Sequence, residues 1–173
     1  VDPLTLNPAV PDQRYKIATS MMIDGEYESA VKEFKGILDA HPDSDLAESC
    51  YYNIGQSYFL AGKYKKAFKA YETLLERFPG IRITGLIHQR EFEAGTSLMQ
   101  ENPKASVPIF ERVIEHNPQG PLAADCQVKI ADAYFLAEDF VNAEPAYRAV
   151  IENYPRSAWA PYAMYRIPLS KLS

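Results

Sequence analysis

Four prolines recur along the chain at nearly equal spacing. They are Pro42, Pro79, Pro118 and Pro155, and they are separated by 37, 39 and 37 residues. An aromatic residue lies eight positions before each proline, and small residues lie twelve and twenty-four positions before it. Because several positions agree in all four registers, the chain contains an internal repeat. In chain order the aromatic residues are Phe34, Tyr71, Phe110 and Tyr147, and the small ones are Ala30, Ala67, Ser106 and Ala143, preceded by Ala18, Gly55, Ala94 and Ala131.

Each repeat has the periodicity of two helices. Residues 67–78 carry one apolar stripe at helical spacing, and residues 50–61 carry another through Ile54, Tyr58 and Ala61. The glycine-bearing sequence AGKY separates the two stripes and indicates a tight turn. The closing proline cannot continue the second helix and biases the residue before it away from helical geometry. The sequence therefore predicts helix A, a turn, helix B and a proline in every unit.

These residues resemble the tetratricopeptide repeats. The family's small–tyrosine–alanine–aromatic–proline pattern is matched best in the second and fourth units and less well in the first and third. The resemblance implies an all-α fold, a right-handed superhelix or α-solenoid with four helix pairs and a C-terminal capping helix. The best matches are Gly55, Tyr58, Ala67, Tyr71 and Pro79, and Ala131, Tyr134, Ala143, Tyr147 and Pro155; the weaker ones are Ala18, Met21, Ala30, Phe34 and Pro42, and Ala94, Ser97, Ser106, Phe110 and Pro118.

The repeat boundaries predict the domain organisation. We expect an extended segment over 1–10 and a single repeat array over 11–173. The C-terminal helix either closes the core as a cap, which is the favoured interpretation, or exposes a docking patch. Its Pro161 is tolerable in a first turn, and Pro168 is expected to end it. The array divides into units at 11–42, 43–79, 80–118 and 119–155, followed by the C-terminal helix at 156–173.

Two further prolines stand inside predicted B helices. Pro108 and Pro145 each lie ten residues before a closing proline. A proline at that depth removes a backbone hydrogen bond and bends a helix, so we expect a kink near Pro108. In the third unit we also expect Asn102 to cap the helix and Pro103 to be its first residue.

Composition and motifs argue against several classes of function. The net charge of −5 makes nucleic acid or an anionic membrane an unsuitable main partner. No apolar run approaches the ~20 residues of a membrane-spanning helix. Metal-binding, phosphate-binding and nucleophile motifs are absent from the sequence. We therefore expect no enzymatic activity, no cofactor and no metal.

The two cysteines occupy equivalent positions. Cys50 and Cys126 lie 76 residues apart, at the same helix-A position of the second and fourth units. Helices stacked at ~8–10 Å would hold them on the order of 20 Å apart, whereas a disulfide requires Cα atoms within about 7 Å. We expect two small buried thiols and no bridge between them.

The family resemblance implies where a partner binds, because helix A makes most of the inner wall of such arrays. Carried over by register, that wall presents aromatic side chains with a few acids, which suits an apolar or mildly basic peptide. Some of these side chains are expected to pack between helices instead. The candidate partner-binding residues are Tyr15, Thr19, Met22, Tyr52, Gln56, Phe59, His88, Glu91, Asp125, Val128, Asp132, Phe135, Tyr162 and Tyr165.

One basic cluster stands out in this acidic chain. It consists of Lys63, Lys65, Lys66 and Lys69. The favoured interpretation is a solvated outer face of helix B. The alternative is a surface for an acidic patch of a partner or for lipid headgroups.

A narrower resemblance points to bacterial envelope proteins. The stretches HPDSDLAESCYYNIGQSYF and YPRSAWAPYAMYRI share the entry P-x-S-x-x-A into helix A. Together with REFEAGTSLM and FERVIEHNPQGPLAADCQVKIADAYF, they look like the outer-membrane assembly lipoproteins of the β-barrel assembly machinery. The TolA-binding periplasmic proteins have similar helix entries.

This resemblance implies a periplasmic, outer-membrane-associated scaffold that binds other envelope assembly subunits and helps β-barrel insertion. Membrane attachment is expected only through a lipid anchor that this chain does not carry. The alternatives are a TolA-binding-type coordinator of envelope processes and a generic cytoplasmic adaptor. The sequence has no heptad run of the kind that often precedes the repeats of TolA-binding proteins.

Overall fold

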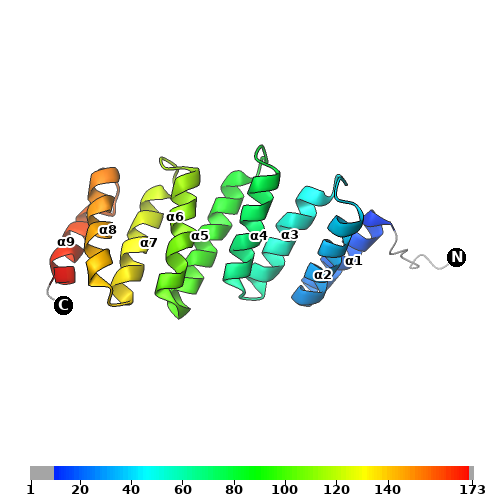
Figure 1. Ribbon diagram of the computed structural model, residues 1–173, viewed down its shortest axis with the longest axis horizontal. Coiled ribbons are helices and arrows are strands. Elements are labelled where there is room, and N and C mark those ends of the chain that lie inside the picture. Colours follow the sequence, from blue (N-terminus) through cyan, green and yellow to red (C-terminus); the bar gives the residue numbers. More distant parts are fainter. Residues whose placement is uncertain (1–9, 172–173) are drawn as a thin grey trace. The chain divides into compact units, whose positions relative to one another are not determined.

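The computed structural model describes residues 10–171, and over these residues the chain is helical with no strand (Figure 1). The all-α prediction is confirmed, as are four helix pairs followed by one last helix. No helix in this part of the chain is long and apolar enough to cross a membrane. The nine helices of the described residues are α1 Pro11–Ile23, α2 Tyr27–Ala40, α3 Ala47–Leu60, α4 Tyr64–Arg77, α5 Thr84–Glu101, α6 Pro103–His116, α7 Ala123–Leu136, α8 Phe140–Asn153 and α9 Ala160–Lys171.

The helices form two compact units. Unit 1 extends to Thr84 and contains α1–α4, whereas unit 2 begins at Gly85 and contains α5–α9. Within each unit, helices that follow one another in sequence pack side by side, and α5 contacts α6 through the rings of Phe92 and Phe110. The single array over 11–173 stays a prediction. All but the last residue of the predicted extended segment 1–10 lies outside the described residues.

The repeat positions build the core of unit 1. Ala30, Phe34, Ala67 and Tyr71 are all fully buried. Gly55 on α3 lies so close to the Tyr71 ring of α4 that a Cβ at this position would overlap the ring. The small residue of helix A is thus what allows the large aromatic of helix B to fill the space between the paired helices.

Unit 2 uses the same arrangement. Phe110 and Tyr147 are fully buried, as are the small residues Ala94 and Ala131. Gly95, one position after the repeat residue Ala94, also lies close to the helix-B aromatic, because a Cβ added to it would lie 2.8 Å from Cε1 of Phe110 on α6. The repeated spacing read from the sequence therefore places buried small and aromatic residues side by side in both units.

In the first, second and fourth units, the tight turn between the paired helices contains a left-handed residue, whereas the third unit joins its helices through Asn102, with φ of −148°. Gly25 has φ of 82° and Gly62 has φ of 71°, which glycine adopts at no steric cost. The equivalent residue of the fourth unit is Glu138, with φ of 56°. It is the only non-glycine residue with positive φ among residues 10–171.

Three prolines of the third and fourth units occupy different positions in their helices. Asn102 caps α6 by accepting from the backbone N–H of Ala105 at 3.2 Å, and Pro103 is the first helical residue, as predicted. Pro108 and Pro145 lie inside α6 and α8, with both rings exposed.

The prediction that Pro168 ends the last helix is wrong, because α9 continues to Lys171. Pro168 is exposed, so its ring occupies solvent, while Ala160 and Ala163 anchor the helix by burial against unit 2. Ser170 also donates to the carbonyl of Arg166 at 3.1 Å, which supports the turn after the proline.

Both cysteines are buried free thiols, as expected. Burial raises the pKa of Cys50 to about 11. The pKa of Cys126 rises to about 12, first through burial and then through the charges of Asp125 and Glu91. Because only the thiolate is nucleophilic, neither sulfur is suited to chemistry near neutral pH.

Candidate partner-binding surfaces

The predicted helix-A residues of unit 1 lie on α1 and α3, and all of them are half-buried. They are Tyr15, Thr19, Met22, Tyr52, Gln56 and Phe59. A half-buried side chain contributes both to the packing of the unit and to its surface. Which of these residues touch a partner stays a prediction.

Internal contacts hold several of these side chains in place. The Tyr15 hydroxyl accepts from Nδ2 of Asn53 at 2.7 Å, and its ring lies edge-on to Phe34 with centroids 5.5 Å apart. The Tyr71 hydroxyl donates to Oε1 of Gln56 at 3.0 Å. These bonds join α1 to α3 and α3 to α4, so the surface of unit 1 is preorganised before any partner binds.

In unit 2 three predicted surface residues are buried. Val128 is only 1% exposed, Glu91 is fully buried, and His88 is buried with its ring stacked on that of His116. A partner cannot reach side chains that their own helices already cover. For these three positions we correct the prediction: they pack internally.

Four other predicted residues of unit 2 meet in one network with α8 and α9. The carboxylate of Asp132 on α7 accepts from the hydroxyl of Tyr147 at 2.6 Å and from that of Tyr162 at 2.9 Å. Arg166 of α9 donates to the Tyr147 hydroxyl at 3.1 Å. Its guanidinium lies 3.8 Å from the centroid of the Phe135 ring, within the range of a cation–π contact.

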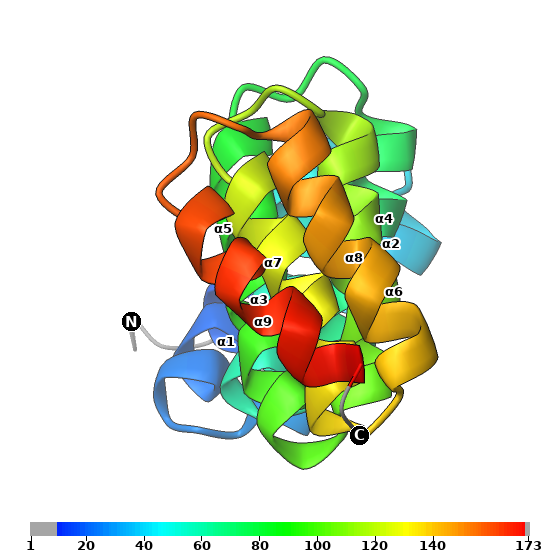
Figure 2. The ribbon, with the colours of Figure 1, turned by 90° about the vertical axis from the view of Figure 1, so that its left-hand side faces the viewer.

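The fourth residue, Asp125, connects the start of α9 to α7. Its carboxylate accepts from the indole N–H of Trp159 at 2.7 Å. In Figure 2, α9 lies in front of α7 and beside α8. One face of α9 thus closes the end of unit 2, whereas Met164 and Tyr165 on its other face are 59% and 68% exposed.

The network shifts the pKa values of its members. Burial raises the pKa of Tyr147, and its hydrogen bond to Asp132 raises it further, while Arg166 opposes the rise. The pKa of Tyr162 is also raised, again by burial first and by Asp132 second. Both hydroxyls therefore remain protonated donors well into the alkaline range.

The two units repeat one hydrogen bond with different chemistry. Gln56 and Asp132 are equivalent helix-A positions, and each accepts from the aromatic hydroxyl of its own helix B, Tyr71 or Tyr147. The pair with the charged acceptor, Asp132 and Tyr147, also contacts an arginine, Arg166. Arg166 was not among the residues predicted from the sequence, although its position four residues after Tyr162 on one helix placed both on the same face.

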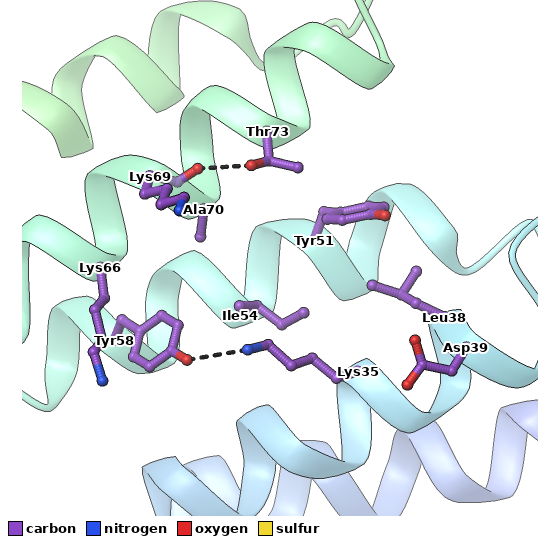
Figure 3. Close-up of a pocket in the computed structure, with 10 residues that line it drawn as sticks. All are labelled: Lys35, Leu38, Asp39, Tyr51, Ile54, Tyr58, Lys66, Lys69, Ala70 and Thr73. Carbon is purple, nitrogen blue, oxygen red and sulfur yellow. Dashed lines mark hydrogen bonds between the residues drawn. The ribbon is translucent and has the colours of Figure 1, made fainter.

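The basic cluster does not act as one surface. Lys63 forms an ion pair with Glu28 of α2. Lys66 and Lys69 instead line a groove together with Lys35, a lysine of another helix that the linear sequence did not connect to them (Figure 3). Among residues 10–171, no group of three His, Cys, Asp or Glu side chains is arranged to hold a metal ion.

Comparison with protein families agrees with this architecture. Residues 49–81 match one model described as Tetratricopeptide repeat, and residues 98–158 match a second with the same description. Together the two matches cover more than half of the chain. The chain belongs to the tetratricopeptide-repeat proteins. Such repeats form scaffolds for protein–protein interaction, typically without enzymatic activity, and bind protein or peptide partners.

Solved structures are similar to the chain at low sequence identity. The nearly identical TPR-like repeats of a Podospora anserina kinesin light chain-type protein match with a TM-score of 0.51 and 14% identity, over 90% of this chain and 82% of that one. MamA from Desulfovibrio magneticus RS-1 matches with a TM-score of 0.49 and 16% identity, over 94% and 84%. No curated protein sequence matches the chain.

Proposed function

We propose that this tetratricopeptide-repeat chain is a scaffold of the bacterial envelope that binds assembly subunits through its helix-A side. The observation that carries the binding part is the row of half-buried aromatic and polar side chains on α1 and α3, fixed by internal hydrogen bonds. A preorganised surface binds with less loss of conformational entropy than a mobile one.

The envelope part of the proposal is supported by sequence resemblance. The P-x-S-x-x-A entries before α3 and α9, at Pro42 and Pro155, resemble those of the outer-membrane assembly lipoproteins. In this proposal the protein faces the periplasm, is attached to the outer membrane by a lipid anchor outside this chain, and helps organise β-barrel insertion.

Affinity capture from detergent-solubilised envelopes tests the proposal. The expected result is recovery of β-barrel assembly subunits. The same binding should then be observed with those subunits in purified form. Recovery of TolA-type partners would replace the proposal by a role as coordinator of envelope processes, and recovery of cytosolic proteins alone would overturn it.

The exposed face of α9 offers a matched pair of variants for this test. Tyr165→Ala removes a predicted partner-binding residue, whereas Met164→Ala removes a neighbouring exposed side chain outside the predicted set. Capture should weaken with Tyr165→Ala and not with Met164→Ala. Equal recovery with both variants would remove Tyr165 from the binding surface.

A further inference from the structure

Unit 1 has a groove between its two B helices, α2 and α4, that the proposed function does not use. Its volume is about 430 Å³, and α2 and α4 form its walls while α3 forms its floor (Figure 3). All residues that line it lie within unit 1. The helix-A residues discussed above, from Tyr15 to Phe59, are not among them.

The floor of the groove and the lower part of its walls are apolar and aromatic. Leu38 and Ile54 are 8% and 4% exposed, and Ala70 packs partly buried against the same core. The rings of Tyr51 and Tyr58 stand at its two ends (Figure 3). A floor of this kind accommodates an aliphatic or aromatic side chain, and removing such a side chain from water is favourable.

Three ammonium groups line the groove, and two of them lie at the Tyr58 end. The Nζ atoms of Lys35 and Lys66 each lie 5.7 Å from the centroid of the Tyr58 ring, and Lys35 donates to its hydroxyl at 3.3 Å. Lys69 stands one helical turn beyond Lys66 on the same wall. Asp39 is the single carboxylate among the lining residues, and it lies toward the Tyr51 end.

Lys66 and Lys69 have no ion-pair partner among residues 10–171, whereas the neighbouring Lys63 is paired with Glu28. The Glu28 carboxylate acts on Lys66 only at longer range. The groove therefore concentrates positive charge in a chain whose net charge is −5. A positive local potential attracts acidic segments and raises the rate at which they associate with the groove.

We propose that this groove binds a short acidic peptide segment of a partner protein, one that carries an aliphatic or aromatic side chain next to its carboxylates. The apolar side chain rests on Leu38 and Ile54. The carboxylates pair with Lys66 and Lys69 at the rim. This site is separate from the helix-A surface, so its test does not depend on the envelope role.

Chemistry favours a peptide over an extended anionic surface. Nucleic acid and anionic bilayers present repeated charge to a broad area, and the net charge of this chain opposes such contact. The groove offers three cations around one apolar recess, which matches a single side chain flanked by a few carboxylates. Binding to a lipid surface instead is one outcome of the experiment below.

A fluorescein-labelled dodecapeptide with one central phenylalanine, flanked by aspartate and glutamate, serves as the probe. Its affinity for the full chain is measured by fluorescence anisotropy at two ionic strengths. Saturable binding that weakens with added salt is expected, because the rim charges are exposed and screened. A peptide with serine in place of phenylalanine, and one with asparagine and glutamine in place of the acids, should each bind more weakly.

Charge reversal provides matched variants on one helix. Lys66→Glu and Lys69→Glu should each lower the affinity by about threefold to tenfold, the size expected for reversing a partly screened ion pair. Lys65→Glu changes the charge of α4 by the same amount outside the groove and should have no such effect. Circular dichroism melts verify that all three variants fold.

Nuclear magnetic resonance locates the peptide. The methyl signals of Leu38, Ile54 and Ala70 should shift on addition of the peptide, while those of Val150 in unit 2 should not. Equal loss of affinity in all three lysine variants, or shifts only outside the groove, would overturn the proposal. So would flotation with vesicles of phosphatidylcholine and phosphatidylglycerol at salt concentrations where the peptide does not bind.

Discussion

Glu138 stands where the turns of the first and second units have Gly25 and Gly62, and it holds a left-handed backbone with φ of 56°. For a residue with a Cβ, this region costs roughly 1–2 kcal/mol relative to ordinary geometry. We predict that Glu138→Gly raises the free energy of unfolding by about 1 kcal/mol in urea titrations. Gly62→Glu should lower it by a similar amount.

A control variant separates strain from charge. Glu26 is also exposed beside a turn, but its φ is −82°. Glu26→Gly relieves no strain and should not stabilise the protein. A gain from Glu26→Gly as large as that from Glu138→Gly would contradict the explanation.

The close approach of Gly55 to Tyr71 leads to a second prediction. Gly55→Ala places a methyl group against the ring of a fully buried tyrosine that cannot move aside without losing its bond to Gln56. Overpacking of this kind costs about 1–3 kcal/mol. The melting temperature of Gly55→Ala should therefore be lower than that of the unmodified chain. Gly80→Ala should leave the melting temperature nearly unchanged, because a Cβ added at Gly80 would have no atom within 4 Å beyond its chain neighbours.

Individual core residues could be predicted from the sequence more reliably than individual surface residues. The aromatic and small positions of each repeat are buried because every copy needs the same packing. The helix-A register, however, could not tell that Val128 is covered and Tyr165 is not. Exposure depends on which neighbouring helix lies over a position, and a repeat pattern averages this difference away.

Among the helices, α6 and α8 each contain a proline at the sixth position, Pro108 and Pro145. A proline there removes one backbone hydrogen bond, and interior proline is about 3 kcal/mol less favourable than alanine in a helix. Because both rings are exposed, alanine leaves the core packing unchanged. We predict that Pro108→Ala and Pro145→Ala each raise the free energy of unfolding by about 1–3 kcal/mol.

Pro103→Ala is the control for these two variants. Pro103 is the first residue of α6, where the N–H has no partner within the helix. Its replacement should change stability little, as measured by urea denaturation followed by circular dichroism. A loss of stability in Pro108→Ala would mean that the proline selects the native geometry of α6.

Helix boundaries could be predicted where a local signal exists. The Asn102 cap and the Pro103 start follow directly from side-chain chemistry at the end of a helix. The end of α9 could not be predicted in this way. The helix continues beyond Pro168 because burial of Ala160 and Ala163 stabilises it. Tertiary packing outweighs a helix-breaking proline when the proline ring faces solvent.

At the scale of the whole molecule, groups held protonated by burial set the dependence of stability on pH. The pKa values of Cys50 and Cys126 are raised to about 11 and about 12, and those of Tyr147 and Tyr162 are raised as well. Unfolding lets these groups return to their ordinary values, so the unfolded chain binds fewer protons at alkaline pH. Stability is therefore complete below about pH 8 and falls as pH rises above it.

Equilibrium unfolding measured from about pH 7 to 11 checks this slope. The variants Cys50→Ala and Cys126→Ala should each have a shallower alkaline decline than the unmodified chain. The lowered pKa values of Glu28 and Glu144 contribute little at acid pH, because both carboxylates are solvent-screened. An alkaline slope unchanged in both cysteine variants would assign the effect to the tyrosines.

Trp159 is the only tryptophan of the chain, and its indole is bonded to Asp125 where α9 meets α7. Its emission therefore reports on one contact, whereas circular dichroism reports on every helix together. A red shift that precedes the loss of ellipticity would mean that the terminal helix detaches while the rest of the protein stays folded. The molecule thus contains a built-in optical probe for fraying at its C-terminal end, with no label to attach.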